Sequence, residues 1–211
     1  STLTEKGASA TLQALSNGAS DYVAKPTGAT SFADALDIVR DELLPRVKAL
    51  VAARRMVAAA APRPVAPVRA TTTPEVLVIA CSTGGPDALS TVLSQLPAAF
   101  SLPVLVTQHM PPVFTTQFAT RLDRVSPLQV REAADGDVVR RGEVLLAPGD
   151  FHLRLARSAG VVRATLDQEP RENFCRPAAD PLLRSAAQVY GPGVLCLVLT
   201  GMGSDGLAGA R

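Results

Sequence analysis

Residues 76–86 read Val-Leu-Val-Ile-Ala-Cys-Ser-Thr-Gly-Gly-Pro, an apolar run that stops at two hydroxyl residues, two glycines and a proline. The six apolar residues are typical of a strand buried on both faces of a parallel sheet. Pro86 suits the first turn of a helix, because its missing N–H needs no partner there. Ser82 is therefore expected where a strand passes into a helix, beside unpaired N–H groups. That position favours a nucleophile or an anion site, and a simple helix N-cap would explain it as well.

The composition is that of a globular protein. The chain has 211 residues, of which 47% are apolar and 4% aromatic, enough for one large domain or two small ones. Its net charge of +2 does not indicate nucleic-acid binding. No apolar run is long enough for membrane insertion. Three widely spaced cysteines and the lack of a visible signal peptide predict a cytoplasmic location. Because the chain begins without Met, we expect a fragment truncated at both ends.

Two further apolar runs also end in polar residues. Residues 102–107 lead to Gln108-His109, and residues 194–200 lead to a glycine-rich segment that contains Asp205. The alternation of strand and helix patterns predicts an α/β fold with a mostly parallel sheet, helices on both faces and an antiparallel insertion near residues 144–166. Ligands bind at the carboxyl ends of the strands in such sheets, so we expect Ser82, His109 and Asp205 to meet there.

These three residue types fit nucleophilic catalysis. A serine hydroxyl needs a base to take its proton, a neutral imidazole can do so near pH 7, and a carboxylate can orient that imidazole. His109 is the favoured base because it follows a buried strand, whereas His152 lies in a predicted hairpin. The alternative for His109 is a structural histidine at a strand end. The order Ser…His…Asp differs from the Ser…Asp…His order of α/β-hydrolases.

A dinucleotide site is the rival interpretation of the last strand. Gly201, Gly203 and Gly206 follow it with the spacing of the dinucleotide fingerprint. The acidic partner of that motif should lie about 20 residues further on, beyond Arg211. Asp205 would also direct negative charge toward a pyrophosphate. The histidines and cysteines show no metal-ligand spacing, so we expect no metal site.

The first 74 residues have a different character. Residues 8–17 predict a helix closed by Asn17-Gly18, residues 19–26 a short strand, and residues from about 31 a helix with Thr30 or Ser31 as its N-cap. Pro45 is expected to kink or end that helix. Residues 51–74 pass from Ala-rich to Pro-rich sequence and predict a linker.

Residues 1–50 resemble the C-terminal part of a flavodoxin-like response-regulator receiver domain. The matching positions are Ser1-Thr2, Gly18-Ala19, Asp21-Tyr22-Val23 and Lys25-Pro26. The resemblance implies that Ser1 is the switch hydroxyl and that Lys25 contacts a phosphoryl group. The phospho-accepting aspartate of that family lies upstream of this chain. Mg²⁺ would be expected only for a complete receiver domain, and no other cofactor is implied.

Residues 75–211 resemble the catalytic domain of the CheB family of protein-glutamate methylesterases, with the C-terminal end of that domain missing. The matching stretches are Ser82-Thr83-Gly84-Gly85, residues 107–112 (Thr-Gln-His-Met-Pro-Pro), residues 147–152 (Ala-Pro-Gly-Asp-Phe-His) and residues 199–206 (Leu-Thr-Gly-Met-Gly-Ser-Asp-Gly). The family implies Ser82 as nucleophile, His109 as base and Asp205 as orienting acid. It also implies that the Met202 N–H binds the oxyanion and that Thr83 and Gly84 line the site.

The resemblance implies a cytoplasmic chemotaxis enzyme that hydrolyses glutamate γ-methyl esters on chemoreceptors and deamidates glutamines. The histidine kinase CheA would phosphorylate its receiver, which covers the catalytic cleft when unphosphorylated. The alternatives are a receptor-binding regulatory module without catalysis and a dinucleotide-binding domain. Two stretches depart from the family pattern: Ala80-Cys81 replaces Gly-Ala, and Phe174-Cys175 replaces Arg-His in the Asn-Arg-His-Arg-Pro-Ser loop beside the substrate cleft.

Overall fold

A parallel sheet forms the centre of the computed structural model, which describes residues 5–23, 31–59 and 72–211. Its strand order is β3-β4-β2-β1-β7, and every neighbouring pair is parallel. The strands are β1 (Val76–Cys81), β2 (Val104–Gln108), β3 (Gln129–Glu132), β4 (Glu143–Leu146) and β7 (Val194–Val198). Both β1 and β2 are buried along their whole length, which explains their continuous apolar sequences. The predicted fold class is confirmed.

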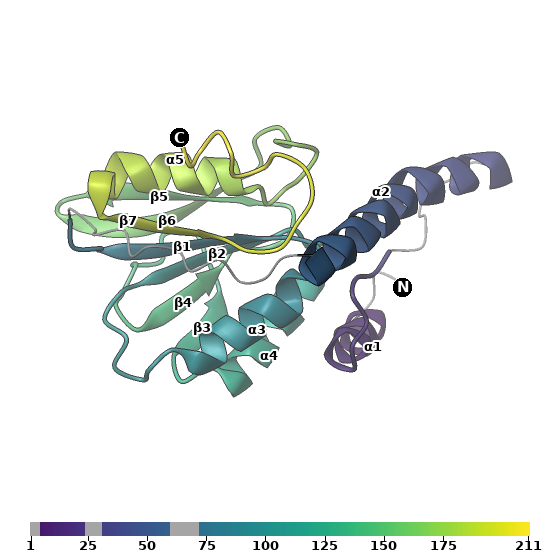
Figure 1. The fold of residues 1–211 in the computed structure, drawn as a ribbon. Helices are drawn as coiled ribbons and strands as arrows, with labels where there is room; N and C mark the ends of the chain where they lie inside the picture. The colour runs from purple at the N-terminus through teal and green to yellow at the C-terminus, as the bar shows by residue number, and fades with distance from the viewer. Residues whose placement is uncertain (1–4, 24–30, 60–71) are drawn as a thin grey trace.

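Helices cover both faces of the sheet (Figure 1). On one face lie α3 (Gly85–Gln95) and α4 (Phe114–Val125). On the other lies α5 (Ala179–Tyr190), with the antiparallel hairpin of β5 (His152–Ser158) and β6 (Val161–Asp167). A short 3₁₀ helix, η1 (Gly191–Gly193), leads into β7. Successive residues of β1 point to opposite faces, so Ile79 joins the core cluster under α3 and α4, whereas Val78 joins the cluster under α5.

The predicted antiparallel insertion was too long. Residues 143–146 form β4 inside the parallel sheet, so the antiparallel part is confined to residues 152–167. The edge strand β3 was not predicted as a strand of this sheet. Its sequence Gln-Val-Arg-Glu buries only Val130 fully, because an edge strand leaves part of its surface to solvent and carries a weak apolar signal.

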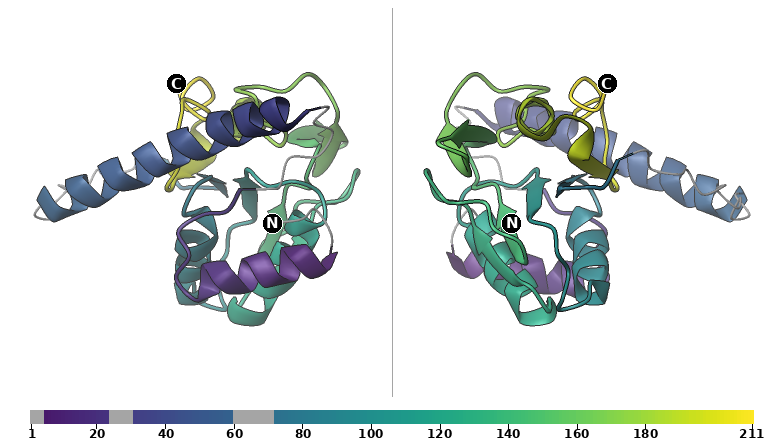
Figure 2. Two further views of the ribbon diagram at one scale, coloured as in Figure 1. Left: turned by 90° about the vertical axis from the view of Figure 1, so that its right-hand side faces the viewer. Right: turned by 90° about the vertical axis from the view of Figure 1, so that its left-hand side faces the viewer.

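The N-terminal segment packs beside this α/β unit. The helix α1 (Glu5–Ser16) lies against α4 and α3, and Ala8, Leu12 and Leu15 are buried in their core cluster. It ends before Gly18, whose φ of 99° is accessible mainly to glycine. The two further views in Figure 2 show α1 beside α3 and α4, and the long helix α2 (Phe32–Ala59) extending beyond the sheet.

Of three predictions for the N-terminal segment, two need correction and one is confirmed. Residues 19–23 form no strand, because no described strand lies beside them to pair with their backbone groups. Pro45 does not interrupt α2; it removes one backbone donor from a helix of 28 residues. The N-cap prediction is confirmed at Ser31, whose hydroxyl accepts a hydrogen bond from the Asp34 N–H at 3.0 Å.

Helix α2 also continues past residue 50, the predicted end of the first unit. Ser1, Lys25 and residues 60–71, half of the predicted linker, lie outside the described residues. Among the described helices, none combines the length and the apolar character needed to cross a bilayer.

Candidate active site

The parallel register places Ser82 and His109 side by side. In the ladder between β1 and β2, Cys81 pairs with Gln108, so the residue after each strand emerges at the same edge. The His109 N–H donates to the Cys81 carbonyl at 3.2 Å, and the Ser82 N–H donates to the Thr200 carbonyl at 2.9 Å. These bonds hold the loops after β1, β2 and β7 together, as the strand pattern predicts.

Three side chains form a continuous hydrogen-bonded row at this edge. The Ser82 hydroxyl lies 3.1 Å from His109 Nδ1, and His109 Nε2 lies 2.6 Å from Asp205 Oδ2. Because the carboxylate accepts a hydrogen bond from Nε2–H, the Nδ1 lone pair faces the serine hydroxyl. The ring nitrogens are exchanged relative to the chymotrypsin triad, in which Nε2 faces the serine, but a donor and an acceptor still stand in the required places.

The N-terminus of α5 fixes the position of Asp205. The Ala179 N–H donates to Oδ2 at 2.6 Å and the Asp180 N–H donates to Oδ1 at 3.1 Å. The amide of Asn173 donates to Oδ1 at 3.2 Å. Unpaired N–H groups and the positive end of a helix dipole favour a carboxylate. Burial by itself would raise the Asp205 pKa, but the bonds to His109 and to these backbone groups lower the pKa below its usual value.

The electrostatic surroundings favour a charged His109. Burial is the largest single influence and lowers the His109 pKa, whereas hydrogen bonds to Asp205 and Cys175, and the charges of these groups, raise it. The result is a pKa of about 9. In this arrangement the imidazole therefore carries a proton at neutral pH, and its capacity as a base increases as the pH rises toward 9.

Two glycines permit close packing near Ser82. A Cβ at Gly85 would lie 2.0 Å from Gln108 Oε1, and one at Gly201 would lie 3.1 Å from the Ser82 Cβ. The backbone can therefore bring the loop after β7 against the nucleophile. Met202 lines the same small pocket as Ser82, and Thr83 lines the wider cleft. Gly84 lies in the turn before α3 with a φ of 74°.

His152 is a structural residue of the core. Its side chain is fully buried, its Nε2 lies 3.1 Å from the Pro170 carbonyl, and its Nδ1 accepts the Ala178 N–H at 3.3 Å. One ring nitrogen thus joins the hairpin to the residue before α5, and the other to the segment that follows β6. Of the two histidines in the sequence, the structure brings only His109 to Ser82.

The glycine-rich segment 201–206 does not form a dinucleotide-binding turn. That motif requires a helix whose N-terminus receives the pyrophosphate, but residues 201–211 form turns and no helix. The carboxylate of Asp205 points to His109 instead. The dinucleotide interpretation is therefore wrong for this segment.

An open cleft of about 520 Å³ surrounds the row and includes residues that the sequence did not single out. One wall comes from α2 and contains Asp41, Pro45 and Arg46. The opposite wall includes the loop of Asn173, Phe174 and Cys175. The thiol of Cys175 lies 3.4 Å from His109 Nδ1. No local sequence signal could place α2 here, because its contacts depend on how two separate segments pack.

The N-terminal segment contacts the site directly. Thr83 donates a hydrogen bond to Asp21 Oδ2 at 2.8 Å, and Arg46 donates to the same oxygen at 2.9 Å. Tyr22 stacks on Phe114, with ring centroids 5.0 Å apart and an interplanar angle of 7°. These contacts link the residue next to the nucleophile to the segment before α2.

Comparisons with known proteins give a consistent answer. A family model described as CheB methylesterase matches residues 77–211. The chain is 52% identical over 221 residues to a protein-glutamate methylesterase/protein-glutamine glutaminase of Nocardioides, with 100% of this chain and 60% of the relative covered. It is 44% identical over 219 residues to a protein of the same name from Trichodesmium erythraeum, with 99% of this chain and 62% of the relative covered.

A solved structure is similar as well. The crystal structure of the Thermotoga maritima CheB methylesterase catalytic domain matches with a TM-score of 0.64 and 46% sequence identity, and covers 66% of this chain and 74% of that one. The chain thus spans about three fifths of the length of the curated relatives it matches.

Proposed function

The chain belongs to the CheB methylesterase family, and we propose that it is a serine esterase that hydrolyses glutamate γ-methyl esters on chemoreceptors in chemotaxis. Deamidation of glutamines is the second reaction in this proposal, supported by the names of its relatives. The observation that carries it is the row of Ser82, His109 and Asp205, with contacts of 3.1 and 2.6 Å, in an open cleft. Three free cysteines support the cytoplasm as its compartment.

In this mechanism the reaction proceeds through an acyl-enzyme. Ser82 Oγ attacks the ester carbonyl while His109 Nδ1 takes the hydroxyl proton, and Asp205 stabilises the imidazolium. His109 then gives the proton to the leaving methoxy oxygen, and methanol departs. Water, activated by the same imidazole, attacks the acyl-enzyme and releases the glutamate. With a glutamine substrate the leaving group is ammonia.

The backbone around Ser82 supplies the oxyanion site in this proposal. The Met202 N–H is the first candidate donor and Thr83 lines the cleft, whereas Gly84 lies in the turn before α3 and lines neither pocket that contains Ser82. Met202 and Ser82 share a pocket of about 130 Å³, which supports this placement. A donor aimed at the developing negative charge lowers the activation barrier by roughly 2.7–4 kcal/mol.

The N-terminal segment is proposed to be part of a receiver domain that controls access to the cleft. The bond between Thr83 and Asp21, and the α2 residues in the cleft wall, support this control. CheA would be the phosphodonor, Lys25 would contact the phosphoryl group, and Ser1 would be the switch hydroxyl. Phosphorylation would weaken the contact between the N-terminal segment and the cleft and thereby raise the esterase rate.

A receptor-binding module without catalysis is the second candidate. It is favoured by the α2 wall of the cleft and by the His109 pKa of about 9, which leaves little neutral base at pH 7. The two candidates differ in methanol release. The module would bind methylated receptor and release none, whereas the esterase would release methanol at a rate that increases with pH.

The direct experiment replaces the nucleophile. Methanol release from methylated chemoreceptor is measured for the wild type, Ser82→Ala and the control Ser94→Ala, whose serine lies exposed near the end of α3. We expect the control to match the wild type and Ser82→Ala to lose about 10⁶-fold in kcat, as in other serine hydrolases. Undiminished activity in Ser82→Ala would exclude the assignment.

A further inference from the structure

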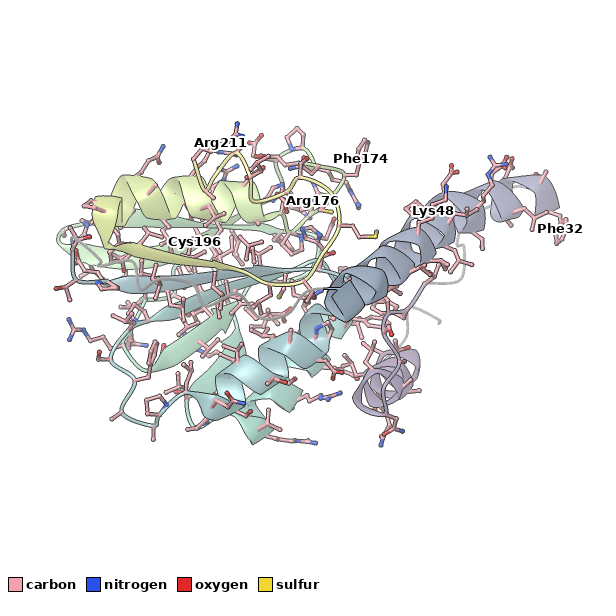
Figure 3. The ribbon with its side chains drawn as sticks, in the orientation of Figure 1. Phe32, Lys48, Phe174, Arg176, Cys196 and Arg211 are labelled. Carbon is pink, nitrogen blue, oxygen red and sulfur yellow. The ribbon has the colours of Figure 1, made fainter. Side chains whose placement is uncertain are left out.

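Cys175 occupies a loop that directs its side chain into the cleft. Asn173 and Phe174 both have positive φ values, 50° and 64°. Backbone bonds in both directions join Glu172 and Cys175, at 3.2 and 2.9 Å. As a result Phe174 stands 95% exposed at the surface, where Figure 3 shows it projecting from the body of the protein, whereas Cys175 is half-buried and lines the cleft.

A thiol and a hydroxyl compete for one acceptor in this cleft, Nδ1 of His109. Cys175 Sγ lies 3.4 Å from His109 Nδ1, and Ser82 Oγ lies 3.1 Å from the same atom. The other ring nitrogen is already bonded to Asp205. A neutral imidazole has one lone pair, so it can take a proton from the thiol or from the hydroxyl but not from both. Cys175, His109 and Asp205 thus repeat the thiol–imidazole–carboxylate arrangement of a cysteine nucleophile.

The other two thiols lack this arrangement. Cys81 is buried in β1, and burial raises its pKa to about 12. Cys196 is exposed on β7, far from the labelled Phe174 of the cleft loop (Figure 3). Protein atoms around its sulfur partly exclude water from it and raise its pKa. Neither has a described hydrogen bond to a histidine. Because the thiolate is the reactive form of cysteine, the three residues should differ strongly in reactivity.

The charges around His109 come from several elements. Asp205 contacts the ring directly, and Asp180 and Arg184 of α5 lie beside that carboxylate. Asp41 and Arg46 of α2 line the same cleft. Among these groups, the hydrogen bonds and charges of Asp205 and Cys175 are the influences that raise the His109 pKa.

We propose that Cys175 is a second nucleophile served by His109, and that covalent modification of its thiol stops the esterase. The proposal rests on the proposed function for its effect on activity. A soft electrophile is the reagent class expected. With iodoacetamide, the Cys175 sulfur forms a bond to the methylene carbon, the carbon–iodine bond breaks, iodide leaves, and the thiol proton passes to His109 Nδ1. The added group would then fill the cleft beside Ser82.

The first arm of the test measures alkylation itself. The full-length protein is treated with iodoacetamide at pH 9, where His109 becomes neutral, and peptide masses give the modification rate at each cysteine. We expect Cys175 to react at least about tenfold faster than Cys196, and His109→Gln to remove that advantage. Equal rates at the two cysteines, or an unchanged Cys175 rate in His109→Gln, would overturn the proposal. This readout does not depend on esterase activity.

The second arm follows methanol release. In the wild type and in Cys196→Ser, methanol release should fall at the rate at which Cys175 is modified. In Cys175→Ser, the rate of methanol release should be the same before and after treatment with the reagent. Loss at the same rate in Cys175→Ser would contradict the proposal. If the untreated wild type released no methanol, the proposed function would fail, and the alkylation rates would still decide the nucleophilic character of Cys175.

A pH profile distinguishes a shared base from a merely structural cysteine. Removing the thiol in Cys175→Ala should lower the His109 pKa and move the basic limb of kcat/KM to lower pH. A shift of one unit gives about tenfold more neutral imidazole at pH 7. An unchanged limb would show that Cys175 does not act on His109.

Discussion

The loops at the carboxyl edge of the sheet and the N-terminal segment beside them both line the cleft, but they contribute in different ways. The sheet loops supply reacting groups, and each is held by bonds within residues 76–211, such as the four that Asp205 accepts. The N-terminal segment supplies the wall formed by α2 and the bond from Thr83 to Asp21. Changes in the first region should therefore abolish chemistry, whereas changes in the second should alter its control.

After the loss predicted for Ser82→Ala, the next largest effect is expected at the orienting carboxylate. Asp205→Asn would keep the shape but favour the wrong imidazole tautomer, and an equivalent change in another serine hydrolase lowers kcat about 10⁴-fold. Steady-state methanol release measures it. Asp87→Asn, exposed in the first turn of α3, is the control and should be neutral. A loss below tenfold in Asp205→Asn would mean that the row of three residues does not act as a unit.

The pH dependence should reflect the raised pKa of His109. Only the neutral imidazole can take the Ser82 proton, so kcat/KM should rise with pH and level off near the pKa of about 9. The neutral fraction of the imidazole, and with it kcat/KM, should rise roughly fiftyfold between pH 7 and 9. A plateau reached already near pH 6.5 would indicate an unperturbed imidazole.

The same pKa shift affects stability in the opposite sense. Because the folded-state pKa of His109 lies above the ordinary histidine value of 6.5, the His109–Asp205 pair contributes its full stabilisation below about pH 6.5, and this is lost as the pH rises through about 9. Activity and stability should therefore change in opposite directions over that range.

The other histidine should affect stability and not chemistry. His152→Leu would remove the bonds to Pro170 and Ala178 and cost about 1–3 kcal/mol of unfolding free energy. Urea unfolding gives this cost. The kcat of the folded protein should stay within about tenfold of wild type. A collapse of kcat without loss of stability would contradict the structural role of His152.

The smallest effect is expected in the N-terminal segment. Asp21→Ala would remove the acceptor for Thr83 and Arg46, and bonds of this kind contribute about 1 kcal/mol each. The basal esterase rate should increase several-fold. Asp37→Ala changes an exposed α2 carboxylate that pairs with Arg40 and is the matched control. A decrease in Asp21→Ala would mean that the contact supports the site instead of restraining it.

The sequence predicted most of the sheet region because its signals are local. Apolar runs bounded by glycine and proline identified β1, β2 and β7. Because ligands bind at the carboxyl ends of parallel strands, the sequence alone predicted that Ser82, His109 and Asp205 lie close together. The edge strand β3 was missed, because its alternating exposure leaves a single fully buried residue.

The rest depended on packing between distant segments. Nothing in residues 19–23 indicates that Asp21 would bond to Thr83, 62 residues away, or that the stretch would form no strand. The proximity of Cys175 to His109 results from the left-handed backbone at Asn173 and Phe174. Neither residue is a glycine, the residue type that would have indicated positive φ values in the sequence. Pro45 was expected to kink or end α2, but the helix continues past it and tolerates one missing donor.

The proposed function requires that Ser82 is a nucleophile activated by His109. Labelling with an organofluorophosphonate, followed by peptide mass spectrometry, tests it most directly, because the reagent forms a stable phosphonyl ester only with an activated serine. We expect one labelled residue, Ser82, in the wild type, a much slower reaction in Asp205→Asn, and no labelling in Ser82→Ala. Labelling of another serine, or a Ser82 that stays unmodified at pH 9 where His109 becomes neutral, would contradict it.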